Sequence, residues 1–314
     1  DEPDPGSPAG QLLAMQRKLA DDRPGGIVDD VTDWLERNPG HPQEPAAYLL
    51  RGDARMIRGF YYKALGDYEL IIGLFPGTEY YRTALQREYD VAMLYIGGVQ
   101  RRGKLFSSVR LYPADDIGVE LLIRIQERLP GSDLGEKASI GIGDYYFDKG
   151  IMDMAVEAYS IFLESTYPNS PRREWALLRL IQASLAQFKG PEFDPTGLFE
   201  AGQRLEQYQS EFPAAAERIG AGALLVRIRE SLALKDLVTA QWYDTRNETL
   251  SAVTMYRRVV YSYADTAAAG RALARLDELG APLVDPREAG PRQPEPNPEG
   301  PAPELEVEIN PPTE

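Results

Sequence analysis

Residues 98–105 read GVQRRGKL, and glycine, four residues, glycine and lysine is the spacing of a phosphate-binding P-loop. In that motif backbone N–H groups surround the phosphates and a serine or threonine after the lysine binds magnesium. Leu105 follows the lysine here, so the magnesium-binding hydroxyl is absent. A P-loop also follows a strand, whereas REYDVAMLYI at 87–96 is typical of the end of a helix. Residues 98–105 therefore do not indicate a nucleotide-binding site.

The same stretch is unusual for its positive charge in an acidic chain. The basic residues of this insert are Arg101, Arg102, Lys104 and Arg110. We expect a solvated insert between two helices, and a contact with an acidic partner or a lipid head group is the alternative.

Other catalytic chemistry lacks its residues. The chain has no cysteine and a single histidine, His41, which lies in the loop-like stretch NPGHPQEP. Thiol nucleophiles, disulfides and Cys/His zinc sites are therefore excluded, and no serine has a histidine to activate it except His41. We expect no enzyme, no cofactor and no metal site.

Charge is concentrated at the two ends. The 314 residues carry a net charge of −15, and residues 285–314 contribute eight acidic and two basic side chains. From Pro282 onward ten of 33 residues are proline, so we expect residues 282–314 to be a disordered acidic tail, as we do the N-terminal segment 1–10. Within the tail, ELEVEI (304–309) could instead add as a strand to a partner's sheet. No basic face indicates nucleic-acid binding.

A helical repeat fills the body of the chain. In each copy a small residue is followed four positions later by an aromatic residue or leucine, and then by a proline that ends the segment. The clearest copies are Ala64, Tyr68 and Pro76; Ala155, Tyr159 and Pro168; and Ala201, Leu205 and Pro213. A second helix-length stretch precedes each copy, and Gly52 and Gly143 in these stretches should lie at tight helix contacts.

Two helices per repeat of about 34 residues is the tetratricopeptide pattern. We therefore predict an all-α, right-handed superhelical solenoid of about six helix pairs over residues 11–281. The predicted repeats are about 11–39, 45–76, 83–130, 135–168, 172–213 and 216–264, with a terminal helix at 267–280.

From about residue 45 to 280 the repeats resemble BamD-like proteins, the tetratricopeptide lipoproteins of the β-barrel assembly machinery in Gram-negative outer membranes. The most specific stretch is SLALKDLVTAQWYDTRNETLSAV at 231–253, followed by YSYADTAAAGRALARLDELG at 261–280. Leu232 and Ala233 match the family's Leu-Ala pair, and an aromatic pair precedes Arg246 at the following turn. The insertion at 188–201 also resembles a loop of that family.

The resemblance implies a non-catalytic scaffold at the periplasmic face of the outer membrane. Its partners would be the periplasmic domains of the barrel-assembly protein and unfolded β-barrel substrates. A lipid anchor is expected if a cysteine ahead of DEPDPGSP was trimmed. A different periplasmic adaptor, for cell-wall or envelope machinery, and a cytoplasmic scaffold are the alternatives.

Two binding surfaces follow from these considerations. We expect the C-terminal repeat to dock the principal partner through Trp242, Tyr243, Arg246, Arg257 and Arg258. We expect a peptide groove on the first helices of earlier repeats, lined by Leu49, Asp53, Met56, Ile140, Asp144 and Phe147. The apolar members of this set could instead pack between repeats.

Overall fold

A computed structural model describes residues 2–21, 25–99, 101–102, 110–112, 115–164 and 170–283. It divides into two compact units, Asp1–Ile228 and Arg229–Glu314. The expected tail lies outside the described residues from residue 284 onward, and Pro168 lies outside them too.

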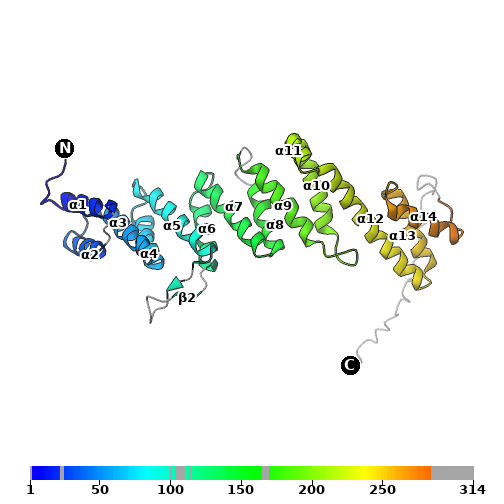
Figure 1. Cartoon of the computed structure of the whole chain (residues 1–314), viewed down its shortest axis with the longest axis horizontal. Helices are drawn as coiled ribbons and strands as arrows, with labels where there is room; N and C mark the ends of the chain where they lie inside the picture. Colours follow the sequence, from blue (N-terminus) through cyan, green and yellow to red (C-terminus); the bar gives the residue numbers. More distant parts are fainter. Residues whose placement is uncertain are drawn as a thin grey trace, which may run out of the picture. The chain divides into compact units, whose positions relative to one another are not determined.

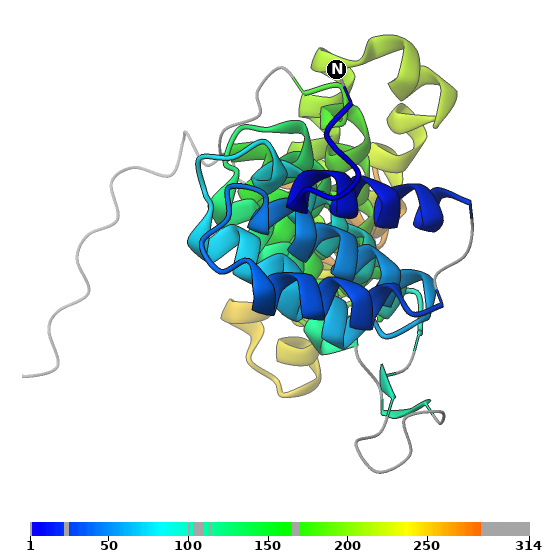
Figure 2. The same ribbon diagram turned by 90° about the vertical axis from the view of Figure 1, so that its left-hand side faces the viewer.

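Unit 1 is a succession of helix pairs (Figure 1), with the basic insert between α5 and α6. The pairs are α1 (Pro8–Ala20) with α2 (Ile27–Arg37), α3 (Glu44–Ile57) with α4 (Tyr61–Leu74), α5 (Tyr80–Ile96) with α6 (Asp115–Arg128), α7 (Asp133–Asp148) with α8 (Met152–Glu164), and α9 (Arg173–Gln187) with α10 (Thr196–Glu211). Each helix packs against the next, and the first helices α1, α3, α5 and α7 also contact one another in order. Figure 2 views this unit from the end that carries α1 and α2.

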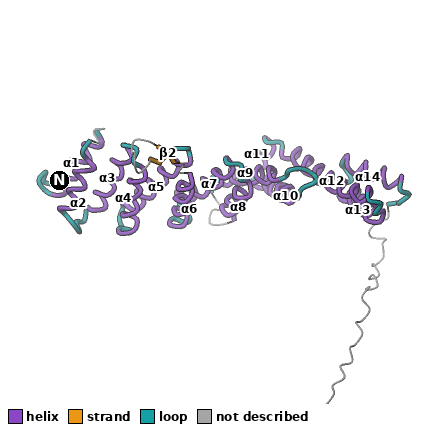
Figure 3. Tube along the Cα trace, turned by 90° about the horizontal axis from the view of Figure 1, so that it is seen from below, coloured by secondary structure: helices purple, strands orange, loops and turns teal. Residues whose placement is uncertain are grey.

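Unit 2, taken by itself, is also built of packed helices. The long helix α12 (Ala221–Thr245) begins in unit 1, and its part from Arg229 packs with α13 (Thr249–Ser262) and α14 (Ala267–Glu278). In the tube of Figure 3 the described residues are mostly helical. The predicted all-α fold of helix pairs is confirmed. Among the described residues, no helix combines the length and the apolar character that crossing a membrane requires.

The repeated small and aromatic positions form the core. Ala64 and Tyr68 of α4 are fully buried, as are Ala155 and Tyr159 of α8. Each tyrosine ring rests against a glycine of the preceding helix. A Cβ atom built on Gly143 would lie only 2.5 Å from Cε1 of Tyr159, and one on Gly52 would collide with the ring of Tyr68. The spacing identified in the sequence thus brings the two helices of a pair together.

Three details differ from expectation. α1 begins at Pro8, inside the segment expected to be disordered, because the Ser7 hydroxyl caps it by accepting from Gly10 N–H at 3.1 Å and the Trp34 indole donates to the Pro8 carbonyl at 2.9 Å. Pro213 starts a helix as well as following one: the short α11 (Pro213–Arg218) precedes α12.

The third difference lies in the basic insert. β1 (Arg101–Arg102) pairs antiparallel with β2 (Arg110–Tyr112), a two-stranded element too short to leave an alternating pattern in the sequence. Lys104 and the side chains of Arg101, Arg102 and Arg110 lie outside the described part of the chain. A partner for the insert therefore stays a prediction.

Candidate functional site

In unit 1 a tyrosine, an aspartate and an arginine from three successive helices contact one another. The Tyr68 hydroxyl of α4 donates to Asp53 of α3 at 2.9 Å, and Nε and Nη2 of Arg87 in α5 donate to the two oxygens of the same carboxylate at 2.9 and 3.2 Å. The close approach at Gly52 brings the tyrosine hydroxyl within reach of the next residue, Asp53. We call this arrangement the Tyr–Asp–Arg cluster; it ties one repeat to the next.

The cluster recurs in unit 2. Tyr256 of α13 donates to Asp244 of α12 at 3.0 Å, and Arg275 of α14 donates to both oxygens of that carboxylate at 2.7 and 3.1 Å. The hydrogen bonds from Arg275 are the main cause of the lowered pKa of Asp244.

A third copy joins α7, α8 and α9 in unit 1, and its arginine behaves differently. The Tyr159 hydroxyl donates to Asp144 at 2.5 Å, but Nε of Arg179 stays 3.9 Å from that carboxylate. The guanidinium instead lies over two rings, 4.4 Å from the centre of Phe147 and 4.6 Å from that of Trp175.

The two sets of residues predicted to line a peptide groove lie in different surroundings. Leu49, Asp53 and Met56 of α3 line a groove of about 480 Å³, together with residues of α1 and α5 that include Leu19 and Arg87. Most of its lining residues on α3 are apolar, while α5 contributes the charged side chains of Arg87 and Asp90. A groove of this size suits a few side chains of an extended polypeptide.

The second set, on α7, does not line this groove. Ile140 is 8% exposed and belongs to the packing between helices. Asp144 and Phe147 are half-buried in the third Tyr–Asp–Arg cluster. The carboxylates of Asp53 and Asp144 were expected to face a ligand, whereas each is already engaged inside the chain because a tyrosine from the paired helix reaches it.

Three of the residues predicted to dock a partner, Trp242, Tyr243 and Arg246, lie in unit 2 at the turn between α12 and α13. Trp242 is 50% exposed, and the Arg246 guanidinium lies 3.6 Å from the centre of its ring. Tyr243 packs edge-on against Trp242 and is partly buried against the core of the unit. Asn247 closes the turn with a φ of 62°, a left-handed conformation that asparagine tolerates better than most residues.

The other two predicted arginines are engaged within unit 2. Arg257 donates to the Pro282 carbonyl at 2.6 Å, and Arg258 pairs with Asp236 at 3.0 Å. Burial raises the pKa of Asp236, and Arg258 opposes this effect. Of the three arginines, Arg246 alone has a side chain that makes no hydrogen bond or ion pair within the described residues.

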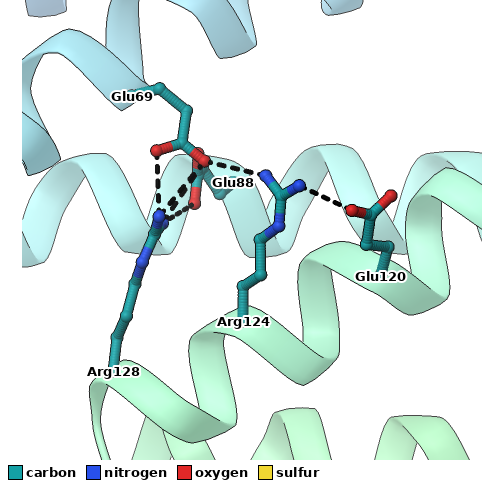
Figure 4. Close-up of polar contacts among 5 residues, drawn as sticks. All are labelled: Glu69, Glu88, Glu120, Arg124 and Arg128. Carbon is teal, nitrogen blue, oxygen red and sulfur yellow. Dashed lines mark hydrogen bonds and ion pairs between the residues drawn. The ribbon is translucent and has the colours of Figure 1, made fainter.

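A charge network around the buried Glu88, between α4, α5 and α6, was not anticipated (Figure 4). Arg128 reaches Glu69 at 3.0 Å and the fully buried Glu88 at 3.3 Å, while Arg124 pairs with Glu69 at 3.2 Å and with Glu120 at 2.5 Å. Burial, with the nearby Glu69 charge, raises the pKa of Glu88 to about 8. One signal was available in the sequence: Glu88 occupies a helix position among apolar ones that face the core.

The acidic side chains of the network and the clusters are engaged by other side chains of the protein. Within the described residues, no group of three or more histidine, aspartate and glutamate side chains is arranged to hold a metal ion. The carboxylates bond to arginine and tyrosine, which positions helices against one another.

Compared with protein families, curated proteins and solved structures, the sequence matches a family model. A family model described as YfiO, outer membrane lipoprotein, matches residues 118–283. No curated protein matches the chain. Among solved structures, the C-terminal part of a TPR repeat-containing protein from Cytophaga hutchinsonii aligns with 12% sequence identity and a TM-score of 0.41, over 85% of this chain and 88% of that one.

Proposed function

The chain belongs to the YfiO family of outer membrane lipoproteins, whose model matches more than half of it, and on this premise we propose that it is a scaffold for assembling β-barrel proteins into the outer membrane. The scaffold acts without catalysis, at the periplasmic face of that membrane. It holds the periplasmic domains of the barrel-assembly protein through unit 2 and engages unfolded substrate segments through unit 1.

The observation that carries this proposal is the stack of Arg246 on Trp242, inside the region that the family model matches. An indole that is half exposed and covered by an arginine offers apolar area together with unused hydrogen-bond donors. Tryptophan and arginine are the side chains that most often dominate protein interfaces. Leu250, 84% exposed on the next helix, adds apolar surface to the same unit.

Unit 1 supports the second half of the proposal. The groove of about 480 Å³ combines the apolar side chains of Leu19, Leu49 and Met56 with the charged side chains of Arg87 and Asp90. An unfolded β-barrel segment alternates apolar and polar side chains. Such a segment could place one face on the apolar wall and direct polar groups toward Arg87 and Asp90.

Calorimetric titration with the isolated periplasmic domains of the barrel-assembly protein from the same organism tests the first half. Saturable binding with one-to-one stoichiometry is the expected result, and its loss in Trp242→Ala would locate the dock in unit 2. Arg271→Gln is the matched control, because Arg271 is exposed in the same unit and its side chain makes no hydrogen bond or ion pair within the described residues. Failure of the wild type to bind these domains, with capture of a different envelope complex, would favour another periplasmic adaptor.

A further inference from the structure

Arg179 differs from the arginines of the other two Tyr–Asp–Arg clusters in what its donors reach. Arg87 and Arg275 each donate two hydrogen bonds to the aspartate of their cluster, at 3.2 Å or less. Arg179 approaches Asp144 only to 3.9 Å and makes no hydrogen bond within the described residues. Its Nε is buried without an acceptor.

Two aromatic rings hold this guanidinium away from the aspartate. Phe147 and Trp175 lie 4.4 and 4.6 Å from it, distances at which cation–π attraction fixes the position of the planar group. The Arg179 side chain keeps 22% of its surface exposed and Trp175 keeps 46%. The cation is therefore held in place, reachable from solvent, and without the acceptor that its counterparts have.

We propose that Arg179, flanked by Phe147 and Trp175, binds a carboxylate of a polypeptide partner, with the exposed face of Trp175 covering the apolar side chain beside it. This inference rests on the proposed binding of unfolded segments by unit 1 and specifies one of its contacts. The carboxylate is either an acidic side chain or the free C-terminus of the bound polypeptide.

The local charge favours a carboxylate over a phosphate. A guanidinium matches both in shape, because its N–H groups form a planar fork. The site holds one cation, and Asp144 lies 3.9 Å from it. A group with a single negative charge balances that cation, whereas a phosphate with nearly two would be repelled by Asp144.

The test combines protein variants with peptide variants. The affinity of each pair is measured by fluorescence anisotropy, with the full chain as the protein. The probe is a dye-labelled nonapeptide of alternating apolar and polar residues with one internal glutamate and a C-terminal phenylalanine carboxylate. Two further versions carry a C-terminal amide or a glutamine in place of the glutamate. The proteins are wild type, Arg179→Gln, Arg179→Lys and the control Arg82→Gln, an exposed arginine whose side chain makes no hydrogen bond or ion pair within the described residues.

We expect one of the two altered peptides to bind the wild type and Arg82→Gln about tenfold more weakly than the parent, the scale of a charge-assisted hydrogen bond. Amidation identifies the C-terminus as the ligand, and the glutamine version identifies the side chain. Arg179→Gln should bind all three versions equally, and Arg179→Lys should discriminate weakly because it lacks the fork. Unfolding curves of both Arg179 variants show whether they remain folded, and the Arg179 Nε–H resonance of the wild type should shift on adding the parent peptide.

Two results would overturn the inference in distinguishable ways. If the wild type binds the three peptides equally, or if Arg179→Gln discriminates as the wild type does, Arg179 is not the carboxylate site, while peptide binding by unit 1 stands. If no version binds the wild type, the binding of unfolded segments by unit 1 fails and this inference fails with it.

Discussion

Arg128 of α6 reaches the fully buried carboxylate of Glu88 in α5 at 3.3 Å, and the same guanidinium also bonds Glu69 of α4 at 3.0 Å. One oxygen of Glu88 has no hydrogen-bond partner within the described residues. Two carboxylates thus lie against the same guanidinium, and that of Glu88 is fully buried. A proton on Glu88 relieves both the burial of charge and the repulsion from Glu69.

We expect this proton to make stability depend on pH. The pKa of Glu88 rises from an ordinary 4.5 to about 8 in the folded chain, so between these values the folded state holds a proton that the unfolded state has released. The stabilisation is complete below the lower value and is lost as the pH rises through the upper one. Relative to Glu88→Gln, the wild type should lose about 2 kcal/mol of unfolding free energy between pH 6 and pH 8.

Urea unfolding at several pH values, followed by circular dichroism, measures this difference. Glu120→Gln is the control, since Glu120 is 61% exposed at the edge of the same network and should leave the pH profile of the wild type unchanged. Parallel profiles for wild type and Glu88→Gln would contradict a raised pKa at Glu88.

The glycine contacts give a prediction on packing. Gly143→Ala places a methyl group against the buried ring of Tyr159, which cannot move without separating α7 from α8. We expect a loss of about 1–3 kcal/mol in unfolding free energy, the usual cost of overfilling a core. Gly66→Ala in α4 is the matched control, because nothing lies within 4 Å of its new methyl group, and there alanine should stabilise by about 0.5–1 kcal/mol. Equal effects at both glycines would show that the contact with Tyr159 does not limit the helix spacing.

The repeat positions that fix helix spacing could be identified from the sequence. The alanine–tyrosine step and the glycines at 52 and 143 are local signals, since residues four apart share a helix face and a glycine marks close approach. The polar partners could not be identified in the same way. Asp53 and Asp144 resemble groove residues until Tyr68 and Tyr159 are seen to reach them across the helix pair.

Contacts between repeats were the least predictable part of the candidate site. The partners Arg179 and Phe147, like Glu88 and Arg128, are far apart in the sequence, and their meeting depends on helix register rather than on any local pattern. The aromatic and basic residues at the turn after α12 were proposed from the family resemblance of residues 231–280 together with the chemistry of tryptophan, tyrosine and arginine side chains.

A second buried charge makes a contrasting prediction on stability. Asp67 of α4 is 1% exposed and accepts hydrogen bonds from Arg51 at 2.8 Å and Arg55 at 2.6 Å. Burial raises its pKa, and the two arginines oppose that shift. Asp67→Ala would leave two largely buried guanidinium groups without their carboxylate, so we expect a loss of about 3–5 kcal/mol.

Thermal and urea unfolding of Asp67→Ala and Asp67→Asn measure this cost. The asparagine retains one acceptor oxygen and should lose less than the alanine. Glu164→Ala serves as the control, because Glu164 pairs with Arg204 at 3.0 Å while 66% exposed, and such surface pairs contribute about 1 kcal/mol at most. An Asp67→Ala protein as stable as this control would mean that water replaces the carboxylate.

The last prediction concerns the dock in unit 2, where charge reversal separates a binding role from a structural one. Arg246→Glu removes a cation that has no carboxylate partner within the described residues, so the fold should tolerate it. Arg258→Glu would instead place a glutamate beside Asp236, whose pKa burial already raises, and unit 2 should lose stability. We therefore expect Arg246→Glu to keep the wild-type unfolding midpoint. If the contact excludes water, its binding to the periplasmic domains of the barrel-assembly protein should weaken by about 1–3 kcal/mol, as measured by calorimetry. Arg271→Glu, with the same charge change elsewhere on unit 2, should bind as the wild type does. Equal affinities for wild type and Arg246→Glu, together with full binding by Trp242→Ala, would place the dock away from the turn between α12 and α13.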